Sequence, residues 1–228
     1  MFVTAGGVSA ILSGAAGGFA VFMFCGLVFS WFGDLFLHLN DKKSSFITGL
    51  LFFMTAHFMY LTAIFKAWNS ISYSYFLLVE IIIIAALVAV CIVYAVKSGI
   101  NLKTPLFVPV GIYGVVLSTM FVKAVSFGFS AIHDYYLYPT MYTSSIIVYR
   151  LSGPVLLMAG ALFFFLSDAT LGILKFNKKQ KDNFPLKCFN MATYFGGQFL
   201  LASTIIFLCQ VQGPFITQLS TINSCVAL

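Results

Sequence analysis

Long apolar segments alternate with short polar ones along most of the chain. A helix needs about 20 mostly apolar residues to cross the roughly 30 Å hydrocarbon layer of a bilayer, and these segments reach that length. The pattern predicts six membrane-spanning helices, the first beginning between residues 8 and 18 and ending near 39. The other five are predicted at residues 46–66, 74–96, 105–125, 151–174 and 188–211.

The composition supports an α-helical membrane protein. Hydrophobic residues make up 61% of the 228 residues and charged residues only 8%, far from the balance of a soluble domain. The apolar segments are continuous, whereas the strands of a membrane β-barrel alternate apolar and polar positions. We therefore predict an all-α, polytopic transmembrane helical bundle that forms a single domain over residues 1–228.

Two regions leave the number of membrane helices open between six and eight. Residues 1–18 are rich in glycine, alanine and serine, which suits either a closely packed extra helix or an irregular segment. Residues 126–150 carry Gly128, Pro139, several tyrosines and charged side chains, which is typical of a partly ordered loop at the membrane interface. We therefore expect a loop at residues 126–150.

Lysines are distributed unevenly between the two predicted sides of the membrane. The loops 40–45, 97–104 and 175–187 together hold nine lysines, while the opposite side holds Lys66, Lys123 and Arg150. Cytoplasmic loops are enriched in Lys and Arg, so the lysine-rich side is predicted to face the cytoplasm. Topology and contact with anionic lipids then account for the net charge of +6, and we expect the lipid bilayer, not nucleic acid, as partner.

Asp34 and Asp168 are conspicuous because each lies inside an apolar helix with no cation within one helical turn in sequence. Counted from Lys42 and Lys175, both lie about 10–15 Å inside the lysine-rich edge at 1.5 Å per residue. A carboxylate in hydrocarbon is costly, so such residues usually face a bundle interior or a watery cavity and mark function. We predict that the two side chains meet in one pocket. The alternative for either one alone is a side chain that reaches back to water.

Other polar residues are expected near the same depth. His57, Tyr113 and Tyr194 fall in three further predicted helices, and Gln198 lies one turn after Tyr194 on the same face. We predict that these four residues bind the substrate or orient water around the aspartates, although each alone also suits ordinary packing. The three histidines lie at different depths without ligand spacing, so we expect neither a metal nor an organic cofactor.

Four segments of the chain form recognisable motifs: residues 26–34 (GLVFSWFGD), 49–60 (GLLFFMTAHFMY), 160–176 (GALFFFLSDATLGILKF) and 193–198 (TYFGGQ). Together they resemble the YhhN-type lysoplasmalogenase family of membrane enzymes. Each motif is short, and their common order and spacing across most of the chain carry the resemblance.

The resemblance implies an enzyme that hydrolyses the vinyl ether bond of a lysophospholipid, lysoplasmalogen, to a fatty aldehyde and a glycerophospho-ethanolamine or -choline. It also implies that Asp34 and Asp168 are the catalytic pair. Vinyl ether hydrolysis needs a protonated acid and a carboxylate that stabilises the resulting cation, much as glycosidases need paired carboxyl groups. Two carboxyl groups that share one proton in apolar surroundings supply both forms.

Two other functions are compatible with the same residues. A transporter for lipids or small solutes would use intramembrane acids for proton coupling, although the sequence shows no inverted repeat of the kind common in transporters. A metal-dependent lipid amidase or related hydrolase would be sensitive to chelators. The sequence is also compatible with a homo-oligomer.

Overall fold

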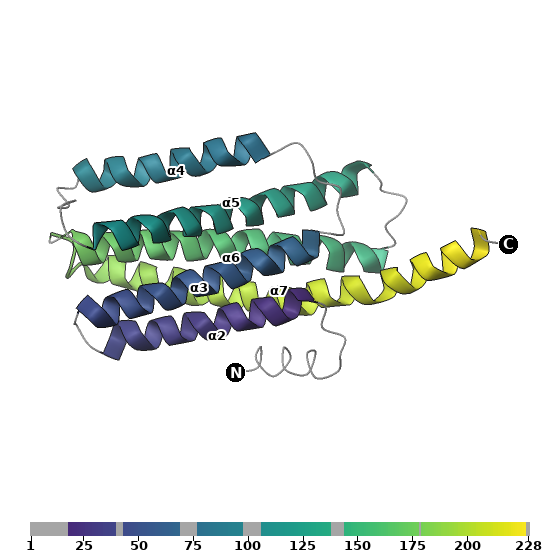
Figure 1. Cartoon of the computed structure of the whole chain (residues 1–228), viewed down its shortest axis with the longest axis horizontal. Helices are drawn as coiled ribbons and strands as arrows, with labels where there is room; N and C mark the ends of the chain where they lie inside the picture. Colours follow the sequence, from purple (N-terminus) through teal and green to yellow (C-terminus); the bar gives the residue numbers. More distant parts are fainter. Residues whose placement is uncertain are drawn as a thin grey trace.

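The computed structural model shows an all-α protein and describes residues 18–39, 43–68, 77–97, 106–137, 144–177 and 179–226. The helices run side by side along one elongated bundle, with successive helices antiparallel (Figure 1). They are α2 (Gly18–Leu39), α3 (Lys43–Trp68), α4 (Leu77–Lys97), α5 (Phe107–Leu137), α6 (Ser144–Phe176) and α7 (Phe184–Val226). The predicted all-α class is confirmed.

Five of these helices are long and apolar enough to cross a membrane. Their candidate spans are Gly18–His38, Lys43–Ala67, Phe107–Leu137, Leu151–Phe176 and Phe184–Leu208. In α4 the apolar stretch is shorter, Leu78–Tyr94. These helices support a membrane protein and are roughly consistent with the predicted number of six to eight. Residues 1–17, where an additional helix was considered, lie outside the described residues, and the single domain stays a prediction.

The interpretation of residues 126–150 as a loop is wrong. α5 continues to Leu137 and α6 already begins at Ser144. Gly128 does not interrupt α5, because it allows close contact with α6: a Cβ at this position would overlap Met158. Phe127 beside it is buried, so packing against the bundle still stabilises the helix beyond residue 125.

The helices pack as two long pairs that α5 joins. α6 lies along α7 and α2 along α3, while α5 contacts both α3 and α6. Large side chains fill the core, and Phe19, Met23, Tyr60, Phe127 and Phe164 are all at most 2% exposed. α4 lies at the edge of the bundle beside α5 (Figure 1). Most of its side chains are exposed and apolar, as expected for a helix surrounded largely by lipid.

A buried ion pair joins α4 to α5. Glu80, in the first turn of α4, binds the ammonium group of Lys123, and their side chains are 2% and 11% exposed. The same ammonium group lies 5.7 Å from the ring centroid of Phe65 on α3, within cation–π range. These contacts attach the outer helix to the bundle.

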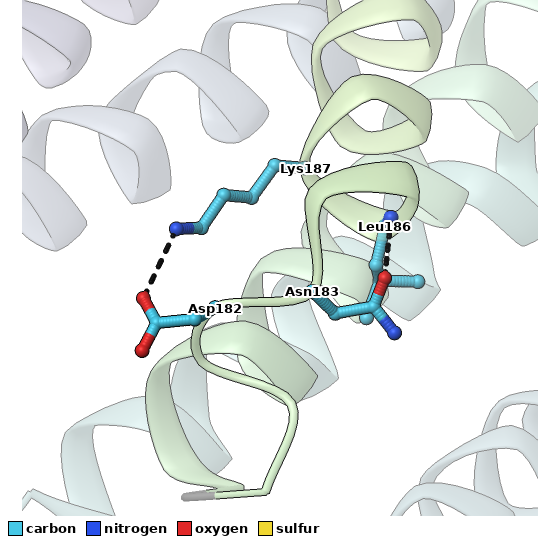
Figure 2. A network of polar contacts seen from close by, with 4 residues as sticks. All are labelled: Asp182, Asn183, Leu186 and Lys187. Carbon is cyan, nitrogen blue, oxygen red and sulfur yellow. Dashed lines mark hydrogen bonds and ion pairs between the residues drawn. The ribbon is translucent and has the colours of Figure 1, made fainter.

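One end of the bundle, on the left in Figure 1, is where α2, α4 and α6 end and α3, α5 and α7 begin. The described lysines at these helix ends are Lys43, Lys97, Lys175 and Lys187. In the turn between α6 and α7, Asn183 caps α7: its Oδ1 accepts a 3.1 Å hydrogen bond from the backbone N–H of Leu186 (Figure 2). Beside this cap, Asp182 and Lys187 form an ion pair of 3.4 Å at the surface. That this end faces the cytoplasm stays a prediction.

Candidate active site

Asp168 is held by a tyrosine from the neighbouring helix. It lies on α6, and its Oδ2 accepts a hydrogen bond from the hydroxyl group of Tyr113 on α5. Tyr113 is buried and Asp168 is partly buried. The fold thus brings together two predicted site residues that are 55 positions apart in the sequence.

Asp34 on α2 is held in the same way by Tyr194 of α7, whose hydroxyl group donates to Oδ2 of the aspartate. Nε2 of Gln198 donates to the Tyr194 hydroxyl at 3.2 Å. The hydroxyl of Tyr60 on α3 donates to Oε1 of Gln198 at 3.5 Å and shares a 3.0 Å hydrogen bond with Ser30. Ser30 lies one turn before Asp34, so this chain of hydrogen bonds starts and ends on α2.

Tyr60 reaches Ser30 because α2 and α3 approach closely. The tyrosine ring packs against Gly26, where any Cβ would overlap the ring atoms. Tyr60 and Ser30 are both fully buried. The glycine that opens the first motif segment therefore makes room for a side chain of the second.

His57 and Phe164 connect the two aspartate groups. The ring centroid of His57 lies 5.4 Å from that of Tyr113 and 6.0 Å from that of Tyr60, in edge-on contacts. The ring of Phe164 lies 4.9 Å from His57 and 5.6 Å from Tyr194. Since both His57 and Phe164 are fully buried, the predicted polar layer is one packed unit built by α2, α3, α5, α6 and α7.

His57 has one nitrogen available for a ligand. Its Nδ1 lies 2.6 Å from the backbone oxygen of Phe53 and donates to it, which leaves Nε2 as the acceptor of the neutral ring. Nε2 is buried and has no hydrogen-bond partner among the described residues. A buried polar atom costs free energy unless a water molecule or a ligand atom bonds to it. The atom is therefore well suited to hold a water molecule or a substrate oxygen.

A cavity reaches Asp168 from the lysine-rich end of the bundle. The cavity volume open to the centre of a water-sized sphere is about 50 Å³, and the cavity opens to the surroundings. Its wall is apolar except for Tyr113, Asp168 and Lys175. An apolar cavity with a few polar groups is the usual form of a site for a small apolar ligand.

The two aspartates differ in their relation to this cavity. Their carboxyl groups interact electrostatically, but Asp34 is not part of the cavity wall. Phe53 lines the cavity, and its ring lies 6.2 Å from that of Tyr194, the partner of Asp34. The arrangement therefore differs from the predicted pocket lined by both carboxyl groups: Asp168 lines the cavity, and Asp34 is not among the residues that line it.

Sequence reasoning missed three residues of this layer. Tyr60 lies three residues after His57, and Phe164 lies one turn before the aspartate of α6, so helical spacing could have identified both. The third is Asn190 of α7, whose Nδ2 donates to the backbone oxygen of Ser167 at 2.7 Å and to its hydroxyl at 3.1 Å. Nothing in the sequence marks Asn190 beyond its polarity.

The histidines do not gather into a metal site. Nδ1 of His38 lies 2.9 Å from the backbone oxygen of Asp34, His57 is in the core, and His133 is exposed on α5. In the part of the chain that the structure describes, no group of three or more His, Cys, Asp or Glu residues could hold a metal ion. That the site needs no metal stays a prediction.

Comparison with known protein families agrees with the motifs. The model of the YhhN family matches residues 2–205, most of the chain. The chain belongs to the YhhN family. All four motif segments of this YhhN protein, and all residues of the polar layer from Ser30 to Gln198, fall within the match. No curated protein and no solved structure gives a significant match to this YhhN protein.

Proposed function

We propose that this YhhN-family protein is a membrane hydrolase that cleaves the vinyl ether bond of lysoplasmalogen. The products are a fatty aldehyde and a glycerophospho-ethanolamine or -choline. The observation that most supports the proposal is the position of Asp168, a carboxyl group in the wall of an otherwise largely apolar cavity. Its bond to Tyr113 and its interaction with a second carboxyl group add to this support.

In the proposed reaction Asp168 is the general acid. It donates its proton to the β-carbon of the vinyl ether, which becomes an oxocarbenium ion. Water adds to the carbon that bears the oxygen and loses a proton to the Asp168 carboxylate, which restores the acid. The hemiacetal then collapses to the aldehyde and the alcohol.

Asp34 is the carboxylate that stabilises the cation. Attraction between opposite charges is much stronger in apolar surroundings than in water, so Asp34 acts through its charge without lining the cavity. Tyr194 orients Asp34 as Tyr113 orients Asp168, and the buried Nε2 of His57 binds a water molecule. A positioned acid contributes about 10²–10⁴-fold to a rate, and orientation of the substrate supplies the remainder.

The test is aldehyde release from purified protein in detergent. Lysoplasmalogen should yield fatty aldehyde, and the saturated 1-alkyl analogue should yield none. Asp168→Asn and Asp34→Asn should each lower the rate at least about 100-fold. Asp182→Asn is the matched control, because its side chain is 92% exposed in the turn between α6 and α7.

Two results would contradict the proposal. Aldehyde release that persists in both aspartate variants would remove the acid–base mechanism. A folded wild-type protein that releases no aldehyde would instead favour the transporter, which liposome flux measurements would then examine.

A further inference from the structure

The cavity that reaches Asp168 contains two charged groups at different depths. Asp168 lies at its inner end, and Lys175, in the last turn of α6, is exposed at its mouth. Among the described residues that line the cavity, Lys175 is the one cation. A ligand that enters from the lysine-rich end therefore passes an ammonium group before it reaches the carboxyl group.

Both charged groups lie on one face of α6. The cavity wall includes Asp168, Leu171, Gly172, Lys175 and Phe176, and their spacing of three and four residues follows a single helical face. The seven residues between aspartate and lysine correspond to roughly 10 Å along the axis at 1.5 Å per residue.

We propose that Lys175 binds the phosphate group of a single-chain phospholipid whose reacting bond lies at Asp168. The inference rests on the proposed hydrolase function. It adds where the headgroup lies and which residue binds it. The lipid spans about 8 Å from phosphorus to the β-carbon of the vinyl ether that Asp168 protonates, as seven bonds advance roughly 1.2 Å each. This length fits the interval between an ammonium group and a carboxyl group two helical turns deeper.

The chemistry of the cavity fits this orientation. A phosphodiester carries one negative charge, which an ammonium group binds as a point charge. Next to the lysine, Gly172 leaves space for the glycerol, since no atom lies within 4 Å of a Cβ built there. The apolar chain continues inward from the reacting bond, where Leu50 and Phe53 of α3 line the cavity.

The first test compares two substrates that differ in the phosphate. Wild-type protein, Lys175→Gln and Lys179→Gln are assayed with lysoplasmalogen and with neutral 1-alkenylglycerol. Lys179 is an exposed lysine of the α6–α7 turn and is not among the residues that line the cavity, so it controls for loss of surface charge. We expect K175Q to lower kcat/KM about tenfold for the phospholipid, mainly through KM, because a charge-assisted bond is lost.

The neutral lipid distinguishes phosphate binding from a structural role. With 1-alkenylglycerol, K175Q should match the wild type, and Lys175→Arg should keep most of the activity toward the phospholipid. An equal loss on both substrates, or no loss on the phospholipid, would overturn the assignment of Lys175. K179Q should behave as the wild type with both substrates, and the same selective loss in K179Q would also overturn it.

A binding measurement separates this inference from the proposed reaction. The saturated 1-alkyl lysophospholipid and 1-alkylglycerol are titrated while thermal unfolding of the detergent-solubilised protein is followed. If the wild type releases no aldehyde, the hydrolase proposal fails. A K175Q variant that binds the phospholipid about tenfold more weakly, and the alkylglycerol equally well, still supports the phosphate site. Equal binding of the phospholipid by K175Q and wild type would reject it.

Glycerophosphoethanolamine, which has no hydrocarbon chain, tests whether the bound phosphate belongs to a lipid or to a soluble phosphoester. We expect no stabilisation at concentrations where the lipid analogue is effective, because the apolar wall contributes to lipid binding alone. Equal stabilisation by the soluble phosphoester would show that the ligand is not a lipid.

Discussion

The hydroxyl group of Tyr113 donates a hydrogen bond to Asp168 across the contact between α5 and α6, at the wall of the cavity. Tyr194 makes the corresponding bond to Asp34 between α7 and α2, and neither residue lines the cavity. Each aspartate is therefore oriented by a tyrosine from another helix, but the cavity meets the carboxyl group on α6. This difference supports two separate roles. Asp168 is the acid that contacts the substrate, and Asp34 is a second carboxylate that acts through its charge.

Replacing Tyr113 with phenylalanine removes the donor and keeps the ring that packs against His57. We expect kcat to fall about ten- to a hundredfold, because Asp168 loses the bond that orients it for proton transfer. Aldehyde release and the thermal midpoint are measured together. Tyr136→Phe, at a position 75% exposed near the end of α5, is the control and should change neither. Unchanged kcat in Y113F would show that the bond is not used in the reaction.

Gly172 allows a steric test of the cavity. It lines the cavity, and a Cβ built there meets no atom within 4 Å, so a side chain can begin there without a clash. We expect Gly172→Leu to lower kcat/KM at least about tenfold, because the side chain occupies space that the substrate needs. The protein should stay as stable as the wild type, since glycine is a weak helix former.

The matched control for this test is Gly111→Leu on α5. Gly111 also has open space around a Cβ, but it is not among the residues that line the cavity. Both variants gain the same side chain inside a helix, so any difference between them reports on the cavity. Equal kcat/KM for both variants would show that the substrate does not use this cavity.

The ion pair between Glu80 and Lys123 predicts a characteristic pattern of stability. Glu80→Leu or Lys123→Met alone removes one charge of the pair and leaves the opposite charge buried. We expect each single variant to lose about 3–5 kcal/mol in the free energy of unfolding. The double variant should recover most of this loss, because no charge of the pair then remains buried. Thermal unfolding of all four proteins in detergent measures the effect. Losses that simply add in the double variant would mean that the pair does not act as a unit.

The spans and the two acids could be predicted because their signals lie along the chain. Lysine-rich breaks in the apolar sequence end α2 near residue 39 and α6 near residue 176, close to the predicted limits. A carboxyl group within an apolar helix is conspicuous without any knowledge of its neighbours. The end of α5 was not predictable in this way, because Gly128 remains helical through its contact with Met158 on another helix.

The composition of the site depends on how each helix is rotated about its axis. In a soluble helix the polar face reveals that rotation, but in a membrane helix the faces toward lipid and toward the bundle are both apolar. Tyr60 and Phe164 therefore look like ordinary membrane residues until their contacts with Ser30 and His57 are seen. The sequence alone is enough to locate the membrane-spanning segments and the acidic residues within them. Side-chain packing between helices sets the rotation, and that packing directs Asp168 into the cavity and Asp34 into the hydrogen-bonded network with Tyr194.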